Sequence, residues 1–137
     1  MFIVRKKFQF CAAHRLSSPH LSEEENRRIF GDCSNENYHG HNYSLQVAVA
    51  GEMDPRTGMV INFDDLKKIV NGVIIARVDH KNLNLDVDFL KGEITTAENM
   101  CRLFWKELAP HFESENSRLF EIVLSETDDN IASYRGE

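Results

Sequence analysis

A histidine pair at the start of an alternating apolar pattern constrains this chain most. His39 and His41 are two residues apart, and residues two apart in a strand point to the same face of a sheet. The apolar residues that follow on the same parity are Tyr43, Leu45, Val47 and Val49. The pattern therefore predicts a strand with one buried face, and at its end two imidazoles aimed at one point, as a metal site requires.

A second alternating stretch supplies a third histidine. Residues 2 to 14 place on one parity Phe2, Val4, Phe8, Phe10, Ala12 and His14. If the two strands pair antiparallel, His14 lies beside His39 and His41 on the same face, within a strand spacing of about 4.8 Å. Taken alone, each histidine is as well explained by a core position with a hydrogen-bond partner. Three together favour a divalent ion, which satisfies all of them at once.

Length and composition predict one globular domain over residues 1–137. The net charge is −6 and there is no basic run, so we expect no nucleic-acid surface. No apolar run is long enough to span a membrane, and the N-terminal residues lack the apolar core of a signal peptide. Three widely spaced cysteines do not form a disulfide framework, so the expected location is the cytoplasm.

The segment that connects the two strands, residues 17–38, is too long for a hairpin turn. Ser22 and Glu25 have the spacing of a capping box, which predicts a short helix that Gly31 ends. Cys33 then lies in a polar loop just before the histidine pair. A loop of this length inside a compact domain is usually functional or disordered.

Two amphipathic helices are predicted in the second half of the chain. The first begins after Asn62 as its N-cap, and its apolar stripe consists of Phe63, Leu66, Ile69, Val70, Val73 and Ile74. The second begins at Thr95-x-x-Glu98, which reads as a capping box and gives Glu98 a purely structural explanation. It runs to Pro110.

Two further stretches end in residues that could carry chemistry. Asp79 and His80, in the loop after the first helix, form either an ordinary turn or a general acid/base with its orienting carboxylate. The last long strand carries on one parity Phe120, Ile122, Leu124 and then Glu126. Because a buried carboxylate is costly unless paired, Glu126 either has left the core or forms the floor for a cationic or NH-rich ligand. Residues 131–135 then form a short antiparallel partner.

The predicted element order is strand, strand, helix, helix, strand, strand. This order and the clean alternation define an α+β fold, in which two helices pack on an antiparallel sheet of four strands. Such a sheet has two open edges, and copies of the chain could cover them by joining into a ring.

Five short motifs, taken together and in their order along the chain, indicate a protein family. They are Phe10-x-Ala12-Ala13-His14-Arg15, Cys33-x5-His39-Gly40-His41-Asn42, Asp79-His80-Lys81-Asn82-Leu83, Thr96-Ala97-Glu98-Asn99 and Glu126-Thr127-Asp128-x-Asn130. Together they resemble the family of 6-pyruvoyl-tetrahydropterin synthase and 6-carboxytetrahydropterin synthase, from about residue 8 to the C-terminus. The resemblance implies the tunnelling fold (T-fold), with trimers that close an antiparallel barrel, two trimers in a hexamer, and sites between subunits.

The resemblance also implies the chemistry. It implies a lyase with one Zn²⁺ per subunit on His14, His39 and His41, and with 7,8-dihydroneopterin triphosphate as substrate. Mg²⁺ is expected alongside the triphosphate, for which Arg15 and Lys81 are the cationic residues we consider. The implied catalytic residues are Cys33 as the base and Asp79 with His80 as a second proton-transfer unit. The implied pterin-binding residues are Glu126, which holds the guanidine-like edge, and Thr96 and Glu98 nearby.

The product separates two branches of the family. One releases triphosphate and gives 6-pyruvoyl-tetrahydropterin, as in tetrahydrobiopterin biosynthesis. The other, in queuosine biosynthesis, releases acetaldehyde as well and gives 6-carboxy-5,6,7,8-tetrahydropterin. The five residues between Cys33 and His39 favour the pyruvoyl branch, whereas Ala97 stands where that branch has a second threonine. A non-catalytic module that binds zinc or pterin is a third alternative, and it would need the histidines but not Cys33, Asp79 and His80.

Overall fold

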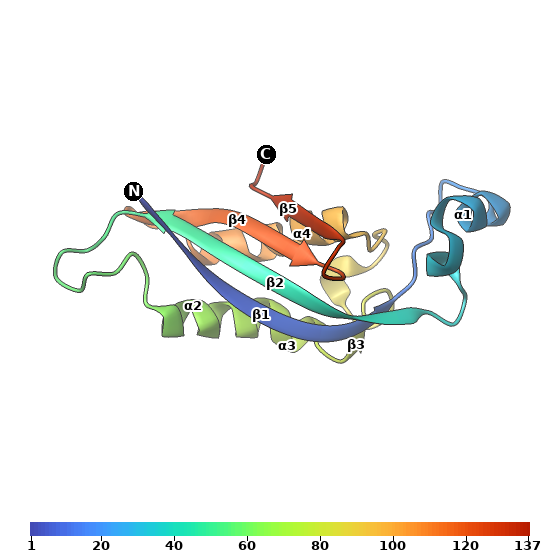
Figure 1. Ribbon diagram of the computed structural model, residues 1–137, viewed down its shortest axis with the longest axis horizontal. Helices are drawn as coiled ribbons and strands as arrows, with labels where there is room; N and C mark the ends of the chain where they lie inside the picture. The colour runs from blue at the N-terminus through green and yellow to red at the C-terminus, as the bar shows by residue number, and fades with distance from the viewer.

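Two long antiparallel strands form the spine of the molecule, whose computed structural model describes residues 1–137 (Figure 1). The strands are β1 (Phe2–His14), β2 (His39–Gly51), β3 (Lys81–Asn82), β4 (Ser117–Ser125) and β5 (Ile131–Tyr134). The α-helices are α1 (Glu23–Phe30), α2 (Phe63–Val70), α3 (Ala76–Val78) and α4 (Ala97–Leu108). The remaining helical segments are a π-helix at Asn71–Ile75 and 3-10 helices at Gly31–Ser34, Asp88–Leu90 and Ala109–His111.

The pairing of β1 with β2 places the site histidines side by side. The antiparallel register sets His14 opposite His39, and His41 follows on the same face. Deeper along that face, Phe10 and Tyr43 form another cross-strand pair, and their rings stack with centroids 4.8 Å apart. The predicted antiparallel pairing, and the meeting of the two strand ends that it implies, are therefore confirmed.

The sheet has five strands in the order β3-β1-β2-β4-β5, where the sequence predicts four. The additional strand, β3, has two residues and pairs parallel with β1 at the edge of the sheet. A strand this short has no alternating pattern, so the sequence carries no signal for it. The other elements follow the predicted order, which confirms the α+β class. The sheet is open within one chain.

A β-bulge changes the predicted face of β4. The register shifts so that Glu121 pairs with Ala48 and Leu119 pairs with Val49. The residue between them, Phe120, is the extra residue of the bulge and is only half-buried, while Leu119 is buried. Alternation alone assigns Phe120 to the core, and this assignment is wrong because one inserted residue exchanges the two faces. Beyond the bulge the predicted alternation holds to the end of β4.

The helices cover one face of the sheet, and the core lies between the two layers (Figure 1). Helix α4 packs on β4 and β5, and the helical segment from α2 to α3 packs on β1. Fully buried side chains from both layers include Leu45, Val47, Leu66, Ile74, Met100, Phe104, Leu108, Ile122 and Leu124. Phe63, predicted on the buried stripe, is 49% exposed. It is the first residue of α2, and its ring lies 6.0 Å from the Lys6 ammonium instead.

A π-helical turn keeps the first long helical segment in register with the sheet. Four residues spaced four apart have no exposed surface: Leu66, Val70, Ile74 and Val78. On a regular α-helix each step of four residues drifts by about 40° around the axis. The π-helix at Asn71–Ile75 fits one more residue into a turn and so offsets the drift. The buried stripe therefore continues to the end of α3, and Asp79 is the first residue beyond it.

The α1 lobe stands at the end of the sheet where β1 stops and β2 starts (Figure 1). The Ser22 hydroxyl accepts a hydrogen bond from the Glu25 N–H, and the Glu25 carboxylate accepts one from the Ser22 N–H, as the capping box predicts. Gly31, with φ of 56°, ends α1. The buried Asn26 side chain accepts from the Ser18 N–H and donates to the Ser18 carbonyl. These contacts hold the connecting segment in one folded lobe.

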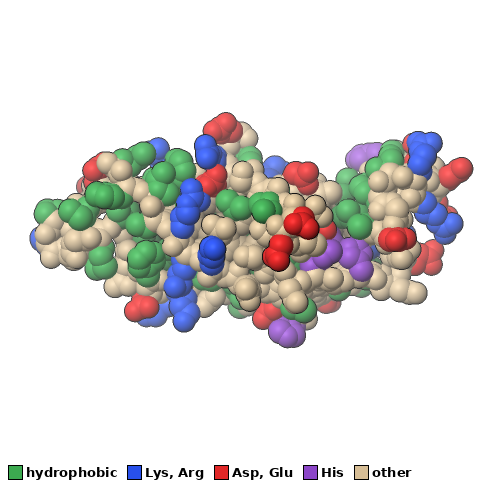
Figure 2. Space-filling view, viewed as in Figure 1, with side chains coloured by type: hydrophobic (Ala, Val, Ile, Leu, Met, Phe, Trp, Pro, Cys, Tyr) green, Lys and Arg blue, Asp and Glu red, His purple; other side chains and the backbone are tan.

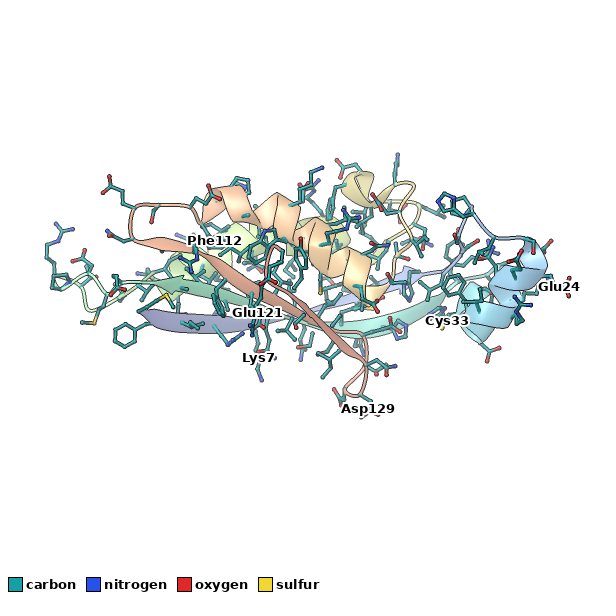
Figure 3. The ribbon with its side chains drawn as sticks, turned by 90° about the horizontal axis from the view of Figure 1, so that it is seen from above. Lys7, Glu24, Cys33, Phe112, Glu121 and Asp129 are labelled. Atoms are coloured by element: carbon teal, nitrogen blue, oxygen red, sulfur yellow. The ribbon has the colours of Figure 1, made fainter.

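The sheet face opposite the helices holds one buried carboxylate. Glu121, in the middle of β4 (Figure 3), accepts hydrogen bonds from Arg5 at 2.6 Å and from Arg135 at 3.0 Å. Burial alone raises the pKa of the Glu121 carboxyl, but the two guanidinium groups outweigh this effect and hold that pKa below its usual value. The cluster links β1, β4 and the C-terminal segment across the sheet.

We expect Glu121→Gln to lower the free energy of unfolding by about 1–3 kcal/mol, because it leaves two arginines without their shared charge partner. Glu115→Gln is the matched control, since Glu115 is exposed and makes no ion pair, and it should change the value by less than about 0.5 kcal/mol. The measurement is denaturation by guanidinium chloride. Equal effects of the two substitutions would show that the cluster contributes nothing to stability.

Candidate metal centre and active site

Three histidine rings meet where β1 ends and β2 begins. One ring nitrogen from each of His14, His39 and His41 lies within 4.8 Å of the other two. The Nε2 atoms of all three are buried and have no hydrogen-bond partner. Unpartnered buried nitrogens cost free energy, and a shared divalent ion is the partner that three converging imidazoles fit. Figure 2 shows histidine side chains gathered on one part of the surface, beside acidic side chains.

The hydrogen bonds of His14 fix which of its ring nitrogens is free. Its Nδ1 lies 3.0 Å from the Thr95 carbonyl oxygen, which can only accept, so Nδ1 carries the proton. Burial lowers the pKa of His14 to about 4, more than the bond to Thr95 raises it, so the ring is neutral at pH 7. A neutral ring protonated on Nδ1 presents a lone pair on Nε2. That lone pair faces His39 and His41 and is available to bind a metal ion.

Thr95 is a residue whose role the sequence pattern misses. The N-cap of α4 is Thr96, whose hydroxyl accepts from the Asn99 N–H at 3.3 Å, so the predicted capping box at Thr95 is wrong by one residue. Either of two adjacent threonines fits an N-cap from sequence alone. Because Thr95 is not the cap, it is buried under the triad and orients His14.

Glu126 places a carboxylate against the triad. Its Oε1 lies 3.3 Å from Nε2 of His41, but the two atoms do not make a hydrogen bond, so that nitrogen remains unpartnered. Burial lowers the pKa of His41, and the charge of Glu126 only partly opposes this, so the ring is neutral at pH 7. Three imidazole ligands suit zinc and neighbouring divalent ions, and they leave a tetrahedral ion one open position.

Cys33 lies in the 3-10 helix that follows α1, at the base of the lobe (Figure 3). Burial raises the pKa of the Cys33 thiol, and the negative charges of Glu126 and Asp32 raise it further. The Cys33 carbonyl accepts a hydrogen bond from the Leu16 N–H at 2.8 Å, which places Cys33 beside the chain just after His14. A thiol in these surroundings stays protonated at pH 7 unless positive charge enters the site.

A cavity of about 410 Å³ adjoins Glu126. Thr96 and Glu98, from the start of α4, line it together with Asp129 from the turn after β4. The volume lies in the range of small-molecule sites. Three carboxylates in its wall offer acceptors to a ligand rich in N–H groups. The structure therefore brings together around one cavity the three residues that the sequence assigns to substrate binding.

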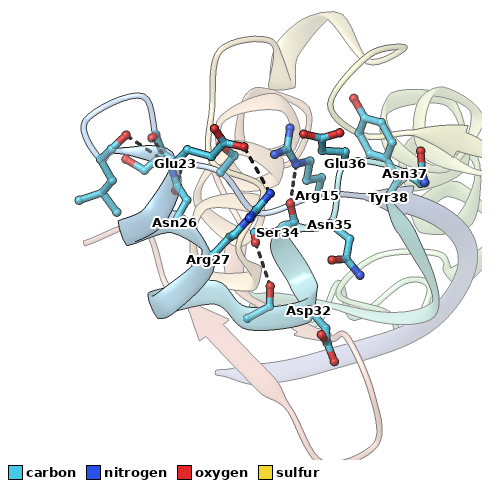
Figure 4. Close-up of a pocket in the computed structure, with 14 residues that line it drawn as sticks. Arg15, Glu23, Asn26, Arg27, Asp32, Ser34, Asn35, Glu36, Asn37 and Tyr38 are labelled. Atoms are coloured by element: carbon cyan, nitrogen blue, oxygen red, sulfur yellow. Dashed lines mark hydrogen bonds and ion pairs between the residues drawn. The ribbon is translucent and has the colours of Figure 1, made fainter.

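A larger cavity of about 750 Å³ lies between the α1 lobe and the start of β2 (Figure 4). Arg15 enters it, and its Nε donates to the Ser34 carbonyl at 2.8 Å. The wall also contains Glu23 and Asp32, so this cavity does not have the uniformly positive lining of a triphosphate site. Lys81, the other cation considered for triphosphate, is exposed on the edge strand β3.

The structure does not bring Asp79 and His80 to the triad of the same chain. The Asp79 carboxylate accepts from the Cys11 N–H at 2.9 Å, and this bond is the main cause that holds the pKa of Asp79 below its usual value. His80 Nδ1 lies 3.0 Å from Asp79, and its side chain is 80% exposed. The His80 N–H also donates to the Cys11 carbonyl, so both backbone groups of Cys11 point in the plane of the sheet toward β3. The pair therefore lies at the β3 edge, away from the histidine triad.

Two non-glycine residues have left-handed backbones, and both lie next to predicted site residues. They are His80, with φ of 60°, and Tyr38, with φ of 66°, which directly precedes His39. Such conformations cost free energy in residues with a side chain and tend to persist at functional positions.

No helix of the structure is both long enough and apolar enough to cross a membrane.

The open antiparallel sheet, its helical layer and the histidine cluster define an α+β protein of the T-fold class. The family described as 6-pyruvoyl tetrahydropterin synthase matches residues 3–137. The 6-pyruvoyl tetrahydrobiopterin synthase of Pongo abelii is 46% identical over 134 residues, covering 98% of this chain and 91% of that protein. The protein of the same name from Homo sapiens is 44% identical over the same shares.

Solved structures agree with the sequence comparison. The structure of Caenorhabditis elegans 6-pyruvoyl tetrahydropterin synthase superposes with a TM-score of 0.92 at 39% identity, covering 99% of this chain and 96% of that one. The chain therefore belongs to the 6-pyruvoyl tetrahydropterin synthase family.

Metal-free protein should lose stability on acidification because of His14. The pKa of His14 is about 4 in the fold and 6.5 as the ordinary value, so the unfolded chain takes up the proton first as pH falls. We expect the free energy of unfolding to fall between pH 6.5 and 4, by up to about 3 kcal/mol from this residue. Denaturation of the EDTA-treated protein across that range measures it.

His14→Gln should show a shallower loss of stability over the same pH range, since glutamine does not titrate. His20→Gln is the matched control, because His20 is exposed in a loop and should leave the pH dependence unchanged. Equal slopes for all three proteins would contradict the assignment of a buried neutral ring to His14.

Proposed function

We propose that this protein is a zinc-dependent lyase that acts on 7,8-dihydroneopterin triphosphate, releases triphosphate and gives 6-pyruvoyl-tetrahydropterin. The observation that carries the proposal is the cluster of three unpartnered imidazoles, with the Glu126 carboxylate 3.3 Å from His41 and with Cys33 hydrogen-bonded to the chain just after His14. Family membership with relatives named 6-pyruvoyl tetrahydrobiopterin synthase supports the substrate and the reaction. The three cysteines are all free, which fits a cytoplasmic enzyme.

In this proposal each residue of the cluster has its own role in binding or proton transfer. Glu126 accepts hydrogen bonds from the N–H groups of the pterin and fixes the ring in the adjoining cavity, where Thr96 and Glu98 complete the wall. Fixing the ring aims the substrate side chain at the histidines. When bound, a divalent ion supplies positive charge at this point, which acidifies hydroxyl groups of the substrate and lowers the pKa of Cys33. The Cys33 thiolate then takes a proton from a carbon of the side chain.

The second proton-transfer unit comes from another copy of the chain. Asp79 and His80 lie on the far side of β1 from their own triad and are open to solvent. The open edges of the sheet give a route to the second copy, because strands of neighbouring copies can pair there and close a barrel. A trimer of this kind, doubled into a hexamer, brings the dyad of one chain to the Cys33 of its neighbour. His80, which Asp79 orients, then returns a proton on the other side of the substrate.

Product analysis tests this function. We expect the zinc-loaded protein, under anaerobic reducing conditions, to convert the substrate into pyruvoyl-tetrahydropterin without acetaldehyde, as mass spectrometry will show. Cys33→Ala should lower kcat by at least about a hundredfold with zinc content unchanged, because it removes the base and no metal ligand. Carboxy-tetrahydropterin with acetaldehyde would assign the protein to the queuosine branch. Bound zinc with intact substrate would instead favour the binding module.

Mixing two inactive variants tests the shared site. Cys33→Ala and His80→Ala should each be nearly inactive alone. After joint unfolding and refolding in equal amounts, about a quarter of the wild-type activity should return, because a site that takes Cys33 from one chain and His80 from another is intact in one of four pairings. No recovery from proteins that refold and assemble would show that both groups act within one chain.

A further inference from the structure

The hydroxyl of Tyr43 lacks a partner in the protein. Five buried side-chain polar atoms make no hydrogen bond, and four of them are imidazole nitrogens of the histidine triad. The fifth is the Tyr43 hydroxyl oxygen, in a residue that is 1% exposed. Tyrosine hydroxyls that are buried normally find a partner, because leaving one unpaired costs free energy. The deficit of hydrogen bonds is thus confined to one place in the molecule, and Tyr43 is part of it.

The ring of Tyr43 is held rigidly beside two of the histidines. It follows His41 on the same face of β2, and it stacks on Phe10 with centroids 4.8 Å apart. Its centroid lies 5.4 Å from that of His41 and 6.0 Å from that of His14. A ring fixed on these sides cannot turn its hydroxyl to a new partner in the core.

Other site residues lie at the same end of the sheet as the hydroxyl. The Glu126 carboxylate lies 3.3 Å from Nε2 of His41, and the His41 ring lies beside that of Tyr43. The Cys33 carbonyl accepts a hydrogen bond from the N–H of Leu16, two residues beyond His14. Neither Glu126 nor Cys33 makes a hydrogen bond to the Tyr43 hydroxyl, which therefore has no partner within the protein.

We propose that Tyr43 is a further catalytic residue, whose hydroxyl donates a hydrogen bond to a side-chain oxygen of the substrate held between the triad, Glu126 and Cys33. The proposal rests on the proposed function, which places a hydroxylated side chain there. An oxygen that gains negative charge in a dry site is stabilised by a donor already in position. A hydroxyl that the protein leaves unpaired costs stability, and such a cost is common in preformed sites.

Tyr43→Phe removes the hydroxyl and leaves the ring, so packing is preserved. We expect binding of 7,8-dihydroneopterin, measured by calorimetry on zinc-loaded protein, to weaken about tenfold. Binding of 6-methyl-7,8-dihydropterin, which lacks the side-chain oxygens, should be unchanged. The ligand-free variant should melt at the same temperature as wild type or higher, because an unpaired hydroxyl has been removed. Tyr134→Phe is the matched control, since Tyr134 packs on Trp105 outside the site.

The outcomes separate the two proposals. If wild type binds dihydroneopterin and Tyr43→Phe binds both pterins as wild type does, the hydroxyl has no role and the inference is wrong. Equal weakening for both pterins, or a lower melting temperature, would make Tyr43 a structural residue only. If wild type binds neither pterin, the proposed function fails, and the inference fails with it.

Discussion

The antiparallel register of β1 and β2 is the constraint on which the rest of the structure depends. It brings the last residue of one strand opposite the first of the other, and so sets His14 against His39 with His41 beside them. A slip of one residue in either strand would turn its histidines to the opposite face. The apolar rows on the same face, fixed by the Phe10–Tyr43 pair and the helical layer, prevent such a slip. The core therefore sets the geometry of the candidate metal centre.

At the same end of the sheet, buried polar atoms without hydrogen bonds lower the stability of the fold. Every buried side-chain polar atom without a hydrogen bond lies there, on three histidines and one tyrosine. Elsewhere the buried polar groups are paired, as Glu121 is with two arginines. Polar groups that the protein itself leaves unpaired are available to an ion and a ligand, and a site held in this form is preorganised. Thr95, which orients His14 from below, belongs to that preparation.

Alternation with a period of two was enough to predict the histidine cluster, because strand parity and antiparallel pairing fix which side chains meet. It was not enough where one residue is inserted, as at Phe120 in β4, since a bulge leaves no mark in the pattern. It also missed Thr95, because two adjacent threonines suit an N-cap equally well. The position of Asp79 and His80 away from the triad follows from pairing at the sheet edge, which a loop sequence does not encode.

The central claim is that three imidazoles hold an ion that keeps a position open for a ligand. X-ray absorption at the zinc edge of the metal-loaded protein tests it most directly. The account predicts three imidazole nitrogens and one further light atom at about 2.0–2.1 Å, with no sulfur neighbour. A sulfur at about 2.3 Å would contradict it. It would make Cys33 a ligand and the site a closed, structural one.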